Sequence, residues 1–120
     1  MNRFELEERL VDLSVMIIKL TKELSNDYAG KHLSGQIIRS GSSIALNYGE
    51  AQSGESRKDF VHKMKISLKE LRETLVCLKI IKRAELCGSA QNVDVALKEC
   101  NELVSIFVKS VETAQKNMRS

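Results

Sequence analysis

Apolar side chains recur every three or four residues along four segments of the chain. The repeat is most regular in about residues 2–25, and it returns in about 56–86 and about 92–117. The first segment carries Leu6, Leu10, Leu13, Ile17, Leu20 and Leu24. This spacing places the apolar side chains along one face of a helix. We therefore predict an amphipathic helix over each of these three segments.

The remaining segment contains the stretch RSGSSIALNYGEAQSGES at 39–56, which has the composition of a linker or a phosphate-binding loop. A phosphate loop would follow a strand, and no strand is indicated here. Leu33, Ile37, Ile44 and Tyr48 instead keep helical spacing, which predicts a second helix over about 31–52. A polar line of the same rhythm runs beside this seam through Gln36, Ser40, Ser43, Asn47 and Glu50. Small side chains on this line would let a neighbouring helix approach closely.

Residues that favour helix ends stand at the borders of these segments. Asn2, Ser56 and Asn92 are candidate N-caps, and Gly88 is a candidate left-handed cap after the third helix. Short turns then join the four helices, so consecutive helices should run in opposite directions. The predicted fold is all-α, an antiparallel up-down-up-down four-helix bundle in a single domain spanning 1–120.

Composition agrees with this fold and limits the cellular setting. Proline is absent, aromatic residues make up 4%, and apolar residues make up 42%. No uninterrupted apolar run is long enough to cross a membrane, and the N-terminus lacks the order of a secretion signal. Cys77, Cys87 and Cys100 form no paired motif. We expect reduced thiols in a cytoplasmic protein without membrane contact.

The first helix carries a second apolar face, made of Phe4, Val11, Val15 and Ile18. These residues lie roughly opposite the leucine seam. A helix that is apolar on two faces is usually buried on both. This predicts self-association into a homo-oligomer. The alternative is that scattered outward apolar residues are ordinary on a protein surface.

Charge is distributed unevenly along the chain, whose formal net charge is +3. Residues 54–89 hold nine basic and five acidic side chains, a local balance of +4. Six of the basic residues fall within an arc of about 80° on the third helix. They are Lys58, Lys65, Lys69, Arg72, Lys79 and Arg83. Such a stripe can bind nucleic-acid phosphates, or it can be a solvated face with intrahelical pairs such as Glu73 with Lys69.

Candidate catalytic chemistry is sparse. His32 and His62 have no partner at metal-ligand spacing, and no nucleophile signature is present. Glu50 beside Asn47 is the one polar pair expected to be half-buried, and a half-buried carboxylate can have a raised pKa. Its simpler interpretation is structural. The sequence therefore predicts no enzyme, no metal and no cofactor.

A family pattern is carried by Gln36, Arg39, Ser43-Ile44, Asn47, Glu50, Arg57, Phe60, Ser67, Glu70 and Leu71. The runs LSGQIIRSGSSIALNYGEA and DFVHKMKISLKEL resemble the four-helix bundle proteins encoded in 23S ribosomal RNA intervening sequences. Ser40, Tyr48 and Ala51 depart from the usual pattern, as does Met64-Lys65-Ile66, which suggests a remote subgroup. The resemblance implies a cytoplasmic bacterial homo-oligomer, with a pentameric ring as the expected form. It also implies kinship with accessory proteins of diversity-generating retroelements, which bind nucleic acid and a reverse transcriptase.

Three functions follow from these patterns. The leading prediction is a non-enzymatic homo-oligomer that binds RNA or DNA through the basic stripe. The second is a protein–protein adaptor that uses the polar line of the second helix or the spare apolar faces. The third and weakest is an enzyme, for example a hydrolase that uses Glu50.

Overall fold

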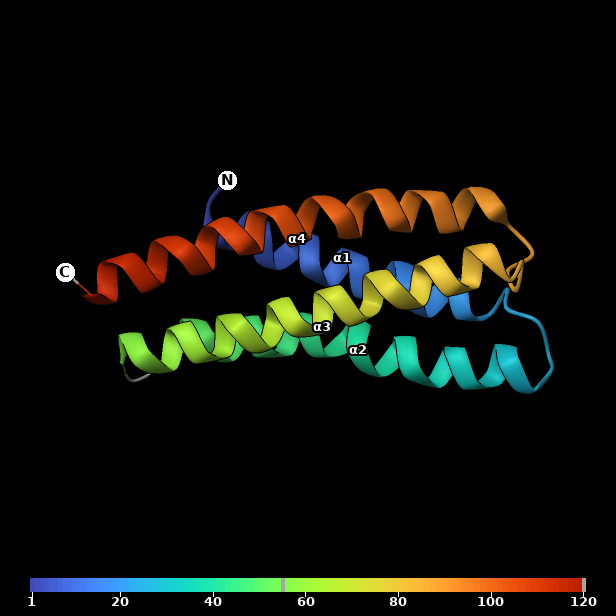
Figure 1. The fold of residues 1–120 in the computed structure, drawn as a ribbon, viewed down its shortest axis with the longest axis horizontal. Helices are drawn as coiled ribbons and strands as arrows, with labels where there is room; N and C mark the ends of the chain where they lie inside the picture. The colour runs from blue at the N-terminus through green and yellow to red at the C-terminus, as the bar shows by residue number, and fades with distance from the viewer. Residues whose placement is uncertain (55, 120) are drawn as a thin grey trace.

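The protein is a bundle of four helices, shown in Figure 1. The computed structural model describes residues 1–54 and 56–119. The helices are α1 (Arg3–Thr21), α2 (Tyr28–Gln52), α3 (Arg57–Arg83) and α4 (Ala90–Arg119). Successive helices run in opposite directions, and both chain ends lie at the same end of the bundle as the α2–α3 turn. The predicted all-α antiparallel bundle is confirmed.

The helices are arranged in a ring around one core. Each consecutive pair is in contact, and α1 also contacts α4. α1 and α3 make no contact with each other across the described chain, so they occupy diagonal corners. A surface on α1 and a surface on α3 can therefore be used by two different partners.

The seam predicted on α1 forms one side of the core. Leu10, Leu13, Ile17 and Leu20 are all essentially inaccessible to solvent. On α4 the repeat of apolar residues every three or four positions runs through Leu97 and Val104, and it predicts the core only in part. These two residues are half-buried, whereas Ala96 and Leu103 are fully buried. Ala96 and Leu103, each one position before a residue of that repeat, therefore face the core, which hydrophobic spacing alone does not reveal.

Side-chain oxygens cap three helix starts as their types suggest. The Glu5 amide donates to Asn2 Oδ1 over 2.9 Å, and the Asp59 amide donates to Ser56 Oγ over 3.1 Å. The Gly30 amide donates to Asp27 Oδ1 over 2.9 Å, so α2 begins earlier than predicted. The prediction of Asn92 as an N-cap is wrong. Its amide donates to Ser89 Oγ over 3.2 Å, and α4 begins at Ala90.

The two inter-helix connections at the other end of the bundle are joined by backbone hydrogen bonds. Ser25 N–H donates to Leu86 O over 2.8 Å, and Gly88 N–H donates to Glu23 O over 3.0 Å. Leu24 and Cys87 thereby form an isolated antiparallel β-bridge. This pairing explains why α1 ends at Thr21 and α3 at Arg83, earlier than the apolar periodicity predicts.

The left-handed residue after α3 is Glu85, with φ of 54°, and not Gly88 as predicted. Glu85 N–H donates to Lys82 O, and Leu86 N–H donates to Ile81 O, each over 3.1 Å. These two bonds make a Schellman motif, which satisfies carbonyls at the helix end. The chain therefore stops its helix without a glycine.

The close-packing interpretation of the glycine- and serine-rich stretch holds on two sides of α2. Toward α1, a Cβ on Gly41 would lie 3.2 Å from Ile17 Cγ2, and Ser14 Oγ donates to Gly41 O over 2.9 Å. Toward α3, Ser40 is fully buried and accepts from Thr74 Oγ1 over 2.8 Å. Small residues thus bring both neighbouring helices close to the α2 backbone.

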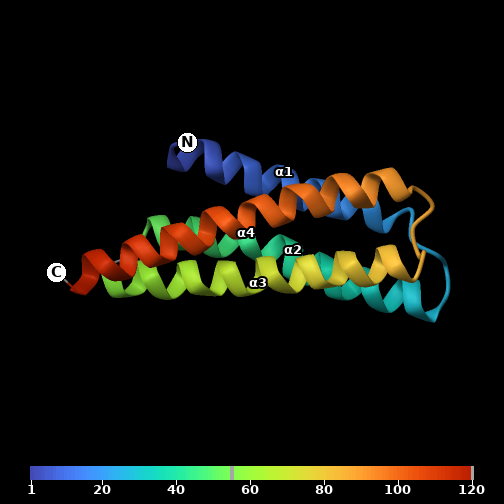
Figure 2. The same ribbon diagram turned by 45° about the horizontal axis from the view of Figure 1, so that its top comes forward.

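The bundle is uneven in length. α1 has 19 residues and α4 has 30, so α4 is longer by about 16 Å at 1.5 Å per residue. Both views show the last turns of α4 extending past the start of α1 (Figures 1 and 2). At that end only three helices surround the core.

Candidate nucleic-acid interface

The six basic residues predicted on α3 form one exposed surface, which we call the basic ridge. Lys58, Lys65, Lys69, Arg72, Lys79 and Arg83 are all exposed. From the first to the last, the ridge spans about 38 Å along the helix at 1.5 Å per residue. Two exposed apolar residues, Val76 and Ile80, lie among the cations near its C-terminal half.

The cations of the basic ridge have no partner of opposite charge among the residues that the structure describes. Within residues 1–54 and 56–119, none of the six forms an ion pair or a side-chain hydrogen bond. The intrahelical pair of Glu73 with Lys69, the example expected for a solvated face, is not formed, because Glu73 pairs with Arg39. Unpaired cations on one helix produce a local positive field that the net charge of +3 understates.

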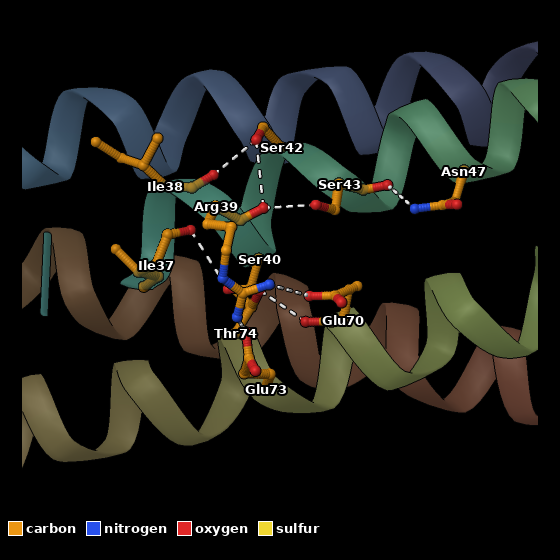
Figure 3. A network of polar contacts seen from close by, with 10 residues as sticks. All are labelled: Ile37, Ile38, Arg39, Ser40, Ser42, Ser43, Asn47, Glu70, Glu73 and Thr74. Carbon is orange, nitrogen blue, oxygen red and sulfur yellow. Dashed lines mark hydrogen bonds and ion pairs between the residues drawn. The ribbon is translucent and has the colours of Figure 1, made fainter. Parts of the chain in front are cut away.

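Two of the three acidic side chains of α3, Glu70 and Glu73, bind a cation on α2 instead (Figure 3). Arg39 pairs with Glu73 and lies 3.4 Å from Glu70. One guanidinium thus holds two carboxylates on the α2 side of α3. Their charge is drawn away from the basic ridge, which occupies the outward side.

Buried hydroxyls reinforce the contact between α2 and α3. Thr74 Oγ1 lies 2.8 Å from both Ser40 Oγ and Glu70 O. Ser67 is fully buried, and its Oγ donates to Ile44 O over 3.1 Å. These bonds fix the rotation of α3 about its axis, and with it the direction in which the basic ridge points.

The other residues of the family pattern lie mainly along the α2–α3 contact. Gln36 is exposed, while Ser43 and Asn47 are half-buried and bond to backbone carbonyls of α2. Glu50 is exposed and accepts from Lys63 Nζ over 2.6 Å, so the expectation that it is half-buried is wrong. Phe60 lies elsewhere, half-buried at the three-helix end.

The second apolar face predicted on α1 is exposed. Phe4 is 64% exposed, and Val11, Val15 and Ile18 are 42 to 44% exposed. Two exposed side chains on α2, Ile38 and Leu46, extend this face. They lie about one turn before and one turn after Gly41, where α2 comes close to α1. We call these six residues the apolar face. Sequence reasoning missed the α2 contribution because Ile38 and Leu46 fit neither the core seam nor the polar line.

The cysteine thiols are poorly suited to nucleophilic chemistry. Burial raises the pKa of the Cys100 thiol to about 12. Burial also raises the pKa of the Cys77 and Cys87 thiols. All three are protonated at neutral pH, whereas the reactive form is the thiolate.

An ion-pair cluster joins α1 to α4. Arg9 lies 2.6 Å from Glu99 and 2.8 Å from Glu102. The hydrogen bond from Arg9 lowers the pKa of the Glu99 carboxyl, and the two glutamates raise the pKa of Arg9. This cluster joins α1 to α4, the one pair of neighbouring helices in the ring that are not consecutive in sequence. The part of the chain that is described holds no group of three or more side chains able to bind a metal ion.

The family is decided by a match that covers nearly the whole bundle. Residues 3–111 match the family model of the 23S rRNA-intervening sequence protein. The chain belongs to this family. The intervening-sequence family match includes all of α1, α2 and α3 and most of α4, so the basic ridge and the apolar face both lie inside it.

A solved structure of similar fold supports the assignment. It is the crystal structure of a protein of unknown function from the S23 ribosomal protein family of Bacteroides thetaiotaomicron VPI-5482. The two are 29% identical with a TM-score of 0.83, and the match covers 93% of this chain and 99% of the other. A search of curated proteins found no match. No described helix is long and apolar enough to cross a membrane.

Proposed function

We propose that this intervening-sequence family protein is a non-enzymatic, cytoplasmic homo-oligomer that binds the phosphate backbone of RNA or DNA. The single observation that carries the proposal is the basic ridge, six exposed cations without an acidic partner in residues 1–54 and 56–119. Lysine and arginine that neutralise phosphates release condensed counterions, and this supplies most sequence-independent affinity. Base readout is not required, since backbone contacts alone position a protein on nucleic acid.

The length of the basic ridge suits a nucleic-acid strand or duplex. Its span of about 38 Å is close to one turn of B-form DNA, which is about 34–36 Å. Lys65, Arg72 and Lys79 are separated by seven residues each, or about 10.5 Å. Cations spread over this length meet several successive phosphates, and this favours a polymer over a single phosphate ion.

Self-association through the apolar face is compatible with this binding. α1 carries four of the six residues of that face, and α1 is diagonal to α3 in the ring. Copies joined through the apolar face would leave each basic ridge open to solvent. A closed assembly, of which a pentamer is the expected form, would then repeat the ridge once per copy and strengthen binding through multivalency.

Charge reversal tests the proposal. Lys65→Glu, Lys69→Glu and Arg72→Glu together should weaken binding of a structured RNA and a duplex DNA by at least tenfold in fluorescence anisotropy. A matched control reverses three exposed lysines away from the ridge. These are Lys19, Lys31 and Lys98. Each set of three reversals changes the formal net charge by six, from +3 to −3. Equal loss in both variants, or no loss in either, would contradict binding through the ridge.

The second candidate function is a protein–protein adaptor that uses the apolar face. It is favoured by the exposure of Phe4 at 64% and Leu46 at 68%, both large apolar side chains. An adaptor should capture one specific protein even after nuclease treatment. The double variant Phe4→Ser with Leu46→Ser should abolish this capture. If the same variant only changes the oligomer mass measured by light scattering, the face serves self-association.

A further inference from the structure

The three-helix end of the bundle contains a hollow beside the start of α3. Two adjoining cavities, of about 370 Å³ and 160 Å³, share Phe60, Ala114 and Asn117 as lining residues. We call them together the end hollow. It exists because α1 begins at Arg3 and leaves the last turns of α4 uncovered (Figure 2). The larger of the two is a shallow depression that is open to solvent.

The end hollow combines an aromatic side chain, hydroxyls and cations. Half-buried Phe60 lines both cavities. Ser110 and Thr113 of α4 add hydroxyls to the larger cavity, and Lys109 adds an ammonium group. Arg57 lines the smaller cavity. None of the described lining residues is acidic, and the positive end of the α3 dipole lies at the same place.

The arginine is held in position by the neighbouring helix. Arg57 Nη1 donates to Asn117 O over 3.3 Å, across the narrow end of the bundle. A guanidinium has five N–H donors in a planar fork, so this bond leaves most of its donors available. Arg57 is exposed, and the donors that remain can meet an anion.

Arg57 lies between the basic ridge and the end hollow around the first turn of α3. At about 100° per residue, Lys58 is about 100° from Arg57 and about 160° from Phe60 on the helical wheel. A strand that leaves the ridge at Lys58 therefore reaches Phe60 by turning past Arg57 around the start of α3. Base stacking on an aromatic side chain beside a positively charged track is the usual way that proteins hold single strands.

We propose that the end hollow holds one unpaired nucleotide of the bound nucleic acid, with its base against Phe60 and its phosphate near Arg57 and Lys109. The inference rests on the proposed function, because the rest of the polymer is held by the basic ridge. It adds a preference, since a blunt duplex can occupy the ridge but cannot supply an unpaired base. Single-stranded ends, loops or bulges are then the favoured targets.

The test compares three RNAs of identical duplex sequence by fluorescence anisotropy. One is blunt, one carries a three-nucleotide 3′ overhang, and one carries the same overhang with all three bases removed as abasic sites. The overhang should bind about tenfold more tightly than the blunt duplex, as expected for one stacked base. The abasic overhang should lose most of this gain although it keeps every phosphate. Phe60→Leu should lose the gain as well and retain blunt-duplex affinity, whereas Tyr28→Leu, at an exposed aromatic residue at the start of α2, should retain both.

Each outcome separates the two proposals. Equal binding of all three RNAs overturns the end hollow and leaves the basic ridge supported. A gain that survives removal of the bases also overturns it, because the gain then comes from phosphate charge. The abasic comparison uses the unaltered protein, so it decides the matter even if Phe60→Leu does not fold. Failure of all three RNAs and of the same three designs made in DNA to bind overturns both proposals.

Discussion

Replacing Glu85 with glycine should stabilise the protein, although it removes a side chain. Glu85 has φ of 54°, a conformation that costs an L-residue about 1–2 kcal/mol. Glycine removes this cost and loses about 0.5–1 kcal/mol through the greater freedom of the unfolded chain. The net gain is about 0.5–1 kcal/mol. For 120 residues at about 2.1 cal/mol/K each, 1 kcal/mol corresponds to about 4 °C in Tm, so the expected rise is about 2–4 °C.

Two further variants make this prediction specific. Glu85→Ala keeps the left-handed penalty and removes the charge, so it measures the effect of charge alone near the end of α3. Gly88→Ala should be neutral or slightly stabilising, because no described glycine has positive φ and the new Cβ would lie 3.6 Å from Glu23 O. Urea unfolding followed by circular dichroism gives all three free energies of unfolding. The geometry assigned to this turn is refuted if Gly88→Ala costs more than 1 kcal/mol while Glu85→Gly gains nothing.

Two other predictions concern α2 and the α1–α4 contact. Gly30→Ala should destabilise the fold by about 3 kcal/mol, because the new Cβ would overlap Ser25 O. Gly35→Ala should stabilise it by about 0.5–1 kcal/mol, since nothing lies within 4 Å of the new Cβ. Urea unfolding that changes both free energies in the same direction contradicts this prediction. Pairing with Arg9 lowers the pKa of Glu99 below its value of about 4.3 in the unfolded chain. The pair therefore contributes its full stability above about pH 4.3, and this contribution is lost as the pH falls through the pKa of Glu99 in the folded protein. The Tm difference between the protein and Glu99→Gln should therefore shrink as pH drops below about 4, and a constant difference from pH 7 to pH 2 would show that ionisation of Glu99 is not involved.

The helices could be predicted from the sequence because their periodicity reports which face is buried. Leu10, Leu13 and Ile17 are buried as their spacing implies. Helix ends were less predictable. The β-bridge between Leu24 and Cys87 ends two helices early, and it depends on a contact between residues far apart in sequence. Local signals cannot encode such a pairing.

The residues of the basic ridge were also evident from the sequence, since a helical wheel places all six cations together. The lack of acidic partners for these cations among the described residues was not evident from the sequence. Glu73 is four residues from Lys69 and suited to pair with it, yet it pairs with Arg39 of another helix. The end hollow was not predictable either, because it depends on where α1 begins relative to the last turns of α4. The helices predicted over about 2–25 and about 92–117 are nearly equal in length, so no signal of it is present in the sequence.

The arrangement separates two surfaces by using diagonal helices. The apolar face lies on α1 and α2, while the basic ridge lies on the outward side of α3. The network of Arg39 with Glu70 and Glu73 keeps acidic charge at the α2–α3 contact. A bundle built this way can assemble through one side and bind a polyanion on another.

The most direct measurement is the salt dependence of binding to a duplex DNA and to a structured RNA of equal length. If all six cations of the basic ridge neutralise phosphates, the logarithm of the association constant should fall with the logarithm of salt concentration with a slope of about −5 per copy of the chain on the duplex. The variant with Lys65, Lys69 and Arg72 reversed should show a slope of about −3 or shallower. A slope near zero for the unaltered protein, or no binding at low salt, would show that the basic ridge is a solvated surface and would contradict the proposed function.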